Sequence, residues 1–244
     1  NPMSNTLKTL IIIPARYNSS RFPGKPLMKI NGIPMIQRTY SQALKNTYTT
    51  DIIVATDSEK IKSFCINNKI PVVITGDCET GTDRVAAVSK LMPEFDCYVN
   101  LQGDEPIIDP KSIDKCIELY FKHYPEYSLI TGYGELSNDE ALLPQTVKVV
   151  LNNKKEAMYF SRSPIPNNSK QYFNHIGIYC FSKDLLSRFA NTSRKSNELD
   201  EQVEMIRMLE MGVKIKMFKM QKTYAVDIPS DIVNVEKFLN EKNI

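Results

Sequence analysis

The chain has 244 residues, 42% hydrophobic and 24% charged, which is ordinary for a soluble globular protein. Its net charge of +3 is too small to indicate a nucleic-acid-binding face, and no apolar run approaches the ~18 residues that cross a membrane, so we expect neither nucleic-acid nor membrane partners. The five cysteines are scattered and lack CxxC spacing, which favours reduced thiols and a cytoplasmic location over a disulfide framework or a zinc site.

Strands and helices alternate through the first half of the sequence. Expected strands cover residues 10–13, 52–56, 71–74 and 97–101, and expected helices cover residues 36–45, 59–67, 82–91 and 113–120. This alternation predicts an α/β fold with a parallel sheet and helices on both faces. In such sheets ligands bind beyond the carboxyl ends of the strands, so the polar residues that follow each strand are the candidates for function.

The second half has a different pattern. Short strands are expected at 146–151, 157–160 and 175–181, around a polar loop at 163–172. A helix at 201–209, two short strands at 214–218 and 223–226, and a final helix at 230–239 complete the prediction. No linker separates two units, so we predict that residues 1–244 form a single domain.

The first strand leads into the segment IIIPARYNSSRFPGKPL, residues 11–27. Arg16, Arg21 and Lys25 follow the strand in a loop that Gly24 allows to turn tightly, and such a loop can cradle phosphates. Neither the GxGxxG fingerprint nor a Walker loop is present. A solvated loop with chance cations is the competing interpretation.

Two further segments place carboxylates after strands. In VNLQGDEPII the strand runs into Asp104 and Glu105, and in YAVDIPSD a short strand precedes Asp227. Asp104 and Asp227 could share one Mg²⁺, which accepts a few carboxylates together with substrate phosphates. Ordinary turn capping by aspartate is the alternative at both positions.

Three other patterns are open to two interpretations each. Arg84, in GTDR, could face an anion at the sheet edge or lie solvated at a capped helix start. His175, in NHIGIYCF, could act as a base, although a structural histidine is the commoner case. The acidic residues of the expected helix at 201–209 could contact a ligand or form salt bridges with Arg207 along one face.

Taken together and in this order, the motifs resemble one known family. They are PAR and SxRxPGK after the first strand, ATD, GTDR, NLQGDEP, VKVV, YFSRSPIP, HIGIY, the ExxExxExxR helix and VDxPxD. The set is similar to the 3-deoxy-D-manno-octulosonate cytidylyltransferases, or CMP-Kdo synthetases, from residue 10 to residue 239. The resemblance implies a Rossmann-like mixed, mainly parallel sheet, a homodimer, and transfer of CMP from CTP to an acidic sugar with Mg²⁺, in the cytoplasm, for lipopolysaccharide or capsule assembly.

The resemblance also implies roles for individual residues. It implies that CTP is held by Pro14, Ala15, Arg16, Arg21, Lys25, Arg84 and Gln102. It implies that the sugar is contacted by Gln102, Arg162, His175, Tyr179, Glu201 and Glu204. Catalysis would depend on Arg16, Lys25, Asp104 and Asp227, of which the two aspartates would ligate Mg²⁺. A sub-region at about 146–182 would contribute to the acceptor site and to the dimer contact.

Three departures from the family pattern fall on what this interpretation makes the acceptor side. Met205 stands where a glutamine is usual, the loop between Pro166 and Phe173 is short, and Ser182 replaces a common basic residue. Replacing an amide by a thioether removes hydrogen bonds from the sugar pocket. We therefore expect cytidylyl transfer to Kdo or to a modified ulosonate such as 8-amino-Kdo.

Three alternatives carry different expectations. A cytidylyltransferase for another acid or for a phosphonate would share the PAR opening but not FSRSPIP and HIGIY together. A glycosyltransferase would show an Asp-x-Asp metal motif, whereas this chain has Asp104-Glu105. A non-catalytic nucleotide-binding protein would have no need of both Asp104 and Asp227.

Overall fold

The computed structural model describes residues 7–48 and 50–244 as an α/β fold built on one mixed sheet. The strands are β1 (Thr9–Pro14), β2 (Lys29–Ile30), β3 (Ile33–Pro34), β4 (Thr50–Thr56), β5 (Val72–Ile74), β6 (Cys97–Leu101), β7 (Leu129–Leu136), β8 (Lys148–Leu151), β9 (Ala157–Ser161), β10 (Tyr172–Phe181) and β11 (Lys216–Lys219). The helices are α1 (Met35–Leu44), α2 (Glu59–Asn67), α3 (Gly81–Leu91), α4 (Pro110–His123), α5 (Asn138–Ala141), α6 (Lys183–Ala190), α7 (Ser196–Glu201), α8 (Met205–Glu210) and α9 (Asp231–Glu241), with a 3₁₀ turn, η1, at Lys25–Leu27. The strand order is β11-β7-β10-β6-β1-β4-β5, and β8 and β9 attach to β10 as a hairpin.

The first half of the chain forms the parallel part of the sheet. β1 lies between β4 and β6 and is parallel to both, and β5 extends the sheet beyond β4. Every residue of β1 is buried. Strands covered on both faces are apolar throughout, which explains the uninterrupted isoleucine run. The predicted parallel arrangement is confirmed.

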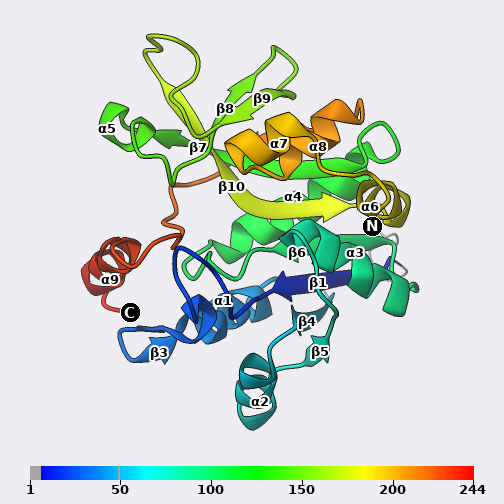
Figure 1. Ribbon diagram of the computed structural model, residues 1–244, viewed down its shortest axis with the longest axis vertical. Helices are drawn as coiled ribbons and strands as arrows, with labels where there is room; N and C mark the ends of the chain where they lie inside the picture. The colour runs from blue at the N-terminus through cyan, green and yellow to red at the C-terminus, as the bar shows by residue number, and fades with distance from the viewer. Residues whose placement is uncertain (1–6, 49) are drawn as a thin grey trace.

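Helices cover both faces of this sheet (Figure 1). Leu10 and Ile12 of β1 pack into the core formed with α3, α6 and α8. Ile11 and Ile13 point to the opposite face and join the core formed with α1, α2 and α4. Because side chains alternate along a strand, one short strand supplies both cores.

The second half adds antiparallel strands. β10 is antiparallel to β6 and β7, and β11 lies parallel to β7. Three elements here were not expected from the sequence, β7, α5 and α6, and α7 begins before the helix expected at 201–209. Two expectations are wrong: residues 223–226 form no strand, and the helix expected at 201–209 is interrupted between α7 and α8 by Gln202.

The segment before α9 returns to the end of β6. The backbone N–H of Val226 donates to the carbonyl oxygen of Asp104 at 3.0 Å. Val226 also packs with Phe22 and Met35 in a third apolar cluster that α9 closes, and Figure 1 shows α9 on the same side of the molecule as β3. The segment therefore carries Asp227 to the carboxyl end of the parallel strands. None of the described helices is both long and apolar enough to cross a bilayer.

Candidate active site

A cleft of about 800 Å³ opens beyond the carboxyl ends of β1 and β6. Among the residues singled out from the sequence, the first half of the chain contributes Pro14, Ala15, Arg16, Arg21, Lys25, Arg84, Gln102 and Asp104 to its lining. The second half contributes Arg162, His175, Tyr179, Glu204 and Asp227. Thus the fold brings together every residue of the predicted site except Glu201, which does not line the cleft.

The loop after β1 is shaped by its backbone. The N–H of Ala15 donates to the carbonyl of Ala55 at 2.9 Å, which continues the β1–β4 pairing past the end of the strand. Gly24 has φ +72°, a conformation that favours glycine, and a Cβ there would lie 3.4 Å from the Tyr17 ring. η1 begins at Lys25, directly after the turn at Gly24. The ammonium group of Lys25 therefore points back toward Asp104, which follows the end of β6.

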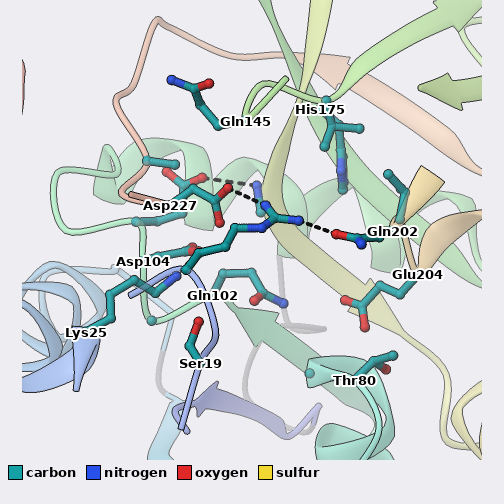
Figure 2. Close-up of a pocket in the computed structure, with 18 of the residues that line it drawn as sticks. Ser19, Lys25, Thr80, Gln102, Asp104, Gln145, His175, Gln202, Glu204 and Asp227 are labelled. Atoms are coloured by element: carbon teal, nitrogen blue, oxygen red, sulfur yellow. Dashed lines mark hydrogen bonds and ion pairs between the residues drawn. The ribbon is translucent and has the colours of Figure 1, made fainter. Parts of the chain in front are cut away.

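Two ion pairs lie inside the cleft. Lys25 Nζ lies 3.1 Å from the Asp104 carboxylate, and Arg21 Nη1 lies 2.6 Å from that of Asp227. Each pair joins a residue predicted to bind phosphate to one predicted to bind metal (Figure 2). The four side chains are 19–35% exposed, so the pairs are partly solvated and weakly held. An anionic ligand and a cation could together take over both sets of partners.

The residues present fit a magnesium ion that arrives with a nucleotide. In residues 7–48 and 50–244 no cluster of three or more histidine, cysteine or acidic side chains forms a ready-made metal site. Asp104 and Asp227 nevertheless face the same cleft from separate segments. Mg²⁺ is commonly held by one or two carboxylates together with substrate phosphates and water, which is the donor set available here.

Glu105 has a different environment from its neighbour Asp104. Its carboxyl group is buried and accepts hydrogen bonds from the Gly177 N–H at 3.3 Å and the Thr223 hydroxyl at 3.4 Å. Burial, followed by the nearby charge of Asp104, raises the pKa of Glu105 to about 8. Glu105 therefore ties β10 to the C-terminal segment at the base of the cleft, whereas the Asp104 carboxylate pairs with Lys25.

Gln102 lies where β6 ends against β10. A Cβ on Gly177 would stand 2.7 Å from Cγ of Gln102, so glycine in the HIGIY motif allows this close approach. The Gln102 carboxamide donates to Asn100 Oδ1 at 3.1 Å. The contact fixes the orientation of the Gln102 side chain in the centre of the cleft, between its two halves (Figure 2).

Arg84 lines the cleft but is buried, with 3% exposure. Its guanidinium donates to the Thr75 hydroxyl and to the Gly76 carbonyl, and it lies 3.6 Å from Asp57. The solvated arginine considered as an alternative is therefore wrong. The ATD and GTDR motifs meet through this arginine, which links the ends of β4 and β5 to the start of α3.

The wall opposite the β1 loop carries His175 and Tyr179 from β10. His175 Nε2 lies 3.2 Å from the Thr131 hydroxyl, and the rings of His175 and Tyr179 are 5.1 Å apart. Burial lowers the pKa of His175 to about 3, so the ring is neutral at physiological pH. A neutral imidazole can exchange hydrogen bonds with a hydroxyl group without adding charge to this wall.

Glu204 and Met205 complete the wall near the start of α3. The Glu204 carboxylate accepts a hydrogen bond from the Thr82 N–H at 3.0 Å, and burial raises its pKa. Met205 is fully buried, lines the cleft and packs into the core beneath the wall. The departure at Met205 thus lies at the site, as expected.

Glu201 serves the structure of this wall. Its carboxylate accepts hydrogen bonds from the Ser161 hydroxyl at 2.8 Å and the Arg162 N–H at 3.0 Å. The Arg162 guanidinium in turn donates to the carbonyls of Glu201 and Gln202, each at 3.0 Å, and to that of Pro144 at 3.1 Å. The Glu201 carboxylate is thus occupied by contacts within the wall and does not face the cleft, whereas Arg162 lines the cleft and joins three segments at its edge.

Arg207 itself does not line the cleft, but it belongs to a buried network that includes Glu198, which does. Its guanidinium pairs with Glu198 at 2.8 Å and with Asp83 at 3.0 Å, and it lies over the Phe189 ring. The acidic residues and arginine of the ExxExxExxR motif are thus divided between structural and cleft positions. Ser182 caps α6 by accepting a hydrogen bond from the Leu185 N–H and does not line the cleft, so counting it as an acceptor-side departure is wrong.

Gln145 and Gln202 are among the cleft residues that the sequence analysis did not single out (Figure 2). Gln145 follows Pro144 in the irregular segment between α5 and β8. Gln202 was hidden by the helical pattern of 201–209, because its left-handed backbone, with φ 54°, interrupts a periodicity that continues on either side.

Comparison with known proteins agrees with this geometry. A cytidylyltransferase family model matches residues 10–215. The chain is 41% identical over 242 residues to the 8-amino-3,8-dideoxy-manno-octulosonate cytidylyltransferase of Shewanella oneidensis, covering 96% of this chain and 99% of that protein. It is 37% identical over 241 residues to the 3-deoxy-manno-octulosonate cytidylyltransferase of Escherichia coli, covering 96% and 97%.

A solved structure is similar over the same length. The structure of CMP:2-keto-3-deoxy-manno-octonic acid synthetase complexed with CTP superposes with a TM-score of 0.87 at 36% identity, covering 96% of this chain and 99% of that chain. The two relatives and this structure extend across both halves of the cleft. The resemblance found in the motifs is confirmed: the chain belongs to the cytidylyltransferase family, and the 3-deoxy-manno-octulosonate cytidylyltransferases are among its relatives.

Proposed function

We propose that the protein transfers CMP from CTP to the anomeric hydroxyl of an acidic octulosonate-type sugar, with Kdo the first candidate, and releases pyrophosphate. The named activities of the relatives support the reaction class. The observation that carries the proposal is the presence of two exchangeable ion pairs, Lys25–Asp104 and Arg21–Asp227, in one cleft. A nucleotide with its metal ion supplies the opposite charge to each member of both pairs.

Binding of CTP would redistribute these partners. The triphosphate would attract Arg16, Arg21 and Lys25, which frees Asp104 and Asp227 to hold Mg²⁺. Bound there, Mg²⁺ would supply charge neutralisation at the α-phosphate. Breaking two partly solvated ion pairs costs little free energy, whereas the charge-assisted hydrogen bonds from these cations to the triphosphate are strong, so the exchange is favourable.

The protein forms no covalent bond to the substrates in the proposed chemical step. The anomeric oxygen forms a bond to the α-phosphorus while the bond to the bridging oxygen breaks; the electron pair leaves with pyrophosphate and the hydroxyl proton is released. Positioning and charge stabilisation are then the main contributions of the side chains. Neutral His175 and the Glu204 carboxyl group would orient the sugar hydroxyls, while Lys25 and Arg16 stabilise the leaving pyrophosphate.

An amino-modified sugar is the second candidate acceptor. Met205 lines the acceptor wall where the family pattern has a glutamine, and one matched relative acts on 8-amino-3,8-dideoxy-manno-octulosonate, according to its name. A thioether offers a sugar hydroxyl only a weak hydrogen-bond acceptor. Selection between the two acids would then depend on the wall formed by β10 and α8.

We further infer a cytoplasmic homodimer serving lipopolysaccharide or capsule assembly. The β8–β9 hairpin, within the sub-region at about 146–182, presents an exposed Met158, and Leu142 and Leu143 beside α5 are exposed as well. These apolar side chains support a contact between two copies. All five cysteines are free thiols, which suits a reducing compartment.

The test is pyrophosphate release with CTP and Mg²⁺, with Kdo, 8-amino-Kdo and a nonulosonic acid offered in parallel. Release with Kdo supports the first candidate, and release with 8-amino-Kdo alone supports the second. No release with any of the three acids, from protein that binds CTP, would contradict the proposed acceptor class while leaving the nucleotide site intact.

A further inference from the structure

The interruption between α7 and α8 occurs at a residue that rarely adopts its conformation. Gln202 has φ 54° and ψ 48°, in the left-handed region that a side chain with a Cβ disfavours. Where a helix ends in this conformation, the residue is usually glycine or asparagine. The end of α7 therefore does not by itself explain why a glutamine stands here.

The surrounding contacts hold Gln202 in place from its backbone. Arg162 donates to the carbonyl oxygens of Glu201 and Gln202, each at 3.0 Å, which are two of the carbonyls that α7 leaves without a helical partner. The guanidinium of Arg162 is also fixed to the Pro144 carbonyl at 3.1 Å. The direction of the Gln202 side chain is thus set by a rigid support and not by the side chain alone.

That side chain points across the cleft to the β1 loop. Its Oε1 accepts a hydrogen bond from Nη2 of Arg21, while Nη1 of the same guanidinium lies 2.6 Å from Asp227. In Figure 2 one dashed line runs from Gln202 and another from Asp227 to the guanidinium between them. Arg21, in the loop after β1, is therefore held both by Asp227 of the C-terminal segment and by Gln202 of the wall formed by β10 and α8.

We propose that Gln202 is a positioning residue that orients the Arg21 guanidinium toward an oxyanion of a substrate. The inference rests on the proposed function, in which Asp227 leaves Arg21 to hold the metal ion. Gln202 is a neutral acceptor, so it retains the guanidinium without neutralising the positive charge. Arg21 can then present its remaining donors to the triphosphate or to the carboxylate of the acceptor acid.

Two variants separate the carboxamide from the backbone. Gln202→Met keeps the length of the side chain but removes the acceptor oxygen, and it leaves the free-energy cost of the left-handed backbone unchanged. Gln202→Gly removes the whole side chain and also relieves that free-energy cost. Because hydrogen bonds to charged groups are stronger than neutral ones, we expect both variants to lower kcat/KM about tenfold. Thermal stability should not follow activity: Gln202→Gly should be at least as stable as the wild type. Gln221→Met, at an exposed position outside the cleft, is the control and should leave kcat/KM unchanged.

A double-mutant cycle tests whether Gln202 acts through Arg21. If it does, Arg21→Lys lowers kcat/KM, and adding Gln202→Met causes little further loss because the interaction is already gone. Losses that multiply in the double variant would overturn the proposal, as would wild-type kcat/KM in both Gln202→Met and Gln202→Gly. These outcomes concern the variants, whereas an inactive wild-type protein would count against the proposed function itself.

The substrate that meets Arg21 follows from two further measurements on the same variants. Weaker CTP binding by calorimetry, without the acceptor acid, identifies the triphosphate as the oxyanion. A higher KM for the acid with unchanged CTP affinity identifies its carboxylate. A fall in kcat with both binding constants unchanged would contradict a role in holding a ground-state anion and would overturn the assignment.

Discussion

The two halves of the cleft use charge in opposite ways. The half beside the β1 loop, where we propose that CTP binds, contains two ion pairs, Lys25–Asp104 and Arg21–Asp227. The four side chains in these pairs are 19–35% exposed. Behind the acceptor half, the side chains of Arg207 and Glu198 are each 2% exposed, and Arg207 has two carboxylate partners. Partly solvated pairs can change partners at little cost, whereas a buried charge that loses its partner is strongly destabilising. The first set is thus available for ligands, and the second holds the wall against which a ligand rests.

The largest effect should come from breaking the buried network. Arg207→Met leaves Glu198 and Asp83 without their main partner, and we expect the free energy of unfolding to fall by about 3–5 kcal/mol in chemical denaturation. Arg194→Met is the matched control, because Arg194 is 31% exposed and lies 3.5 Å from the same Glu198. It should cost less than about 1 kcal/mol. Equal losses in the two variants would remove the distinction between the halves.

The reverse result is expected for the exposed pairs. Asp104→Asn and Asp227→Asn should each lower kcat by a hundredfold to a thousandfold, about 3–4 kcal/mol in activation free energy, because the proposed metal loses a charged ligand. Stability should change by less than about 1 kcal/mol. Asp51→Asn, at an exposed position of β4 outside the cleft, should keep full activity. Activity close to wild type in Asp104→Asn or in Asp227→Asn would contradict the metal assignment.

The desolvated wall predicts a dependence of stability on pH. The pKa of His175 is lowered to about 3 by burial, so between pH 3 and pH 6.5 the unfolded chain binds a proton at this residue and the folded chain does not. The free energy of unfolding should therefore fall as the pH falls, by up to about 1.4 kcal/mol per pH unit from this residue. Denaturation at pH 4.5 and pH 6.5 should show a smaller pH effect in His175→Gln than in the wild type. The same slope in both proteins would mean that His175 is protonated in the folded state.

The smallest effect concerns the choice of acid. Met205→Gln restores an amide at the wall, and we expect the ratio of kcat/KM for Kdo to that for 8-amino-Kdo to rise by a few fold, as one added hydrogen bond allows. Met205→Leu keeps the position apolar and should leave the ratio unchanged. A ratio that falls or stays constant in Met205→Gln would show that Met205 does not select the acceptor.

The parallel half could be predicted from the sequence because its signals are local. The isoleucine run of β1 and the loop residues up to Lys25 follow one another along the chain, and the carboxyl end of β6 leads directly to Asp104. For Asp227 the local sequence left a turn and a shared metal site as alternatives, and the strand expected before it is absent. Its position depends instead on the hydrogen bond from Val226 to the Asp104 carbonyl.

The acceptor half was harder to predict because its features are imposed by contacts distant in sequence. β7 contains Gly132, where a Cβ would stand 2.0 Å from the sulfur of Met220, so only glycine fits there. Because glycine has a low propensity for strands, the sequence pattern of β7 does not indicate a strand clearly. Glu201 and Gln202 continue a helical pattern, yet Arg162 stabilises a break between them and α8. Nothing in the local sequence distinguishes the structural Glu201 from Glu204, which lines the cleft.

The hydrogen bond between Val226 and Asp104 also has a consequence for the order in which the protein becomes functional during synthesis. The β1 loop and the end of β6 leave the ribosome long before residue 227, so an incomplete chain has the cations for phosphate but only one of the two carboxylates. On the proposed function, the second carboxylate of the metal site therefore arrives with the C-terminal segment, after the sheet to which that segment docks.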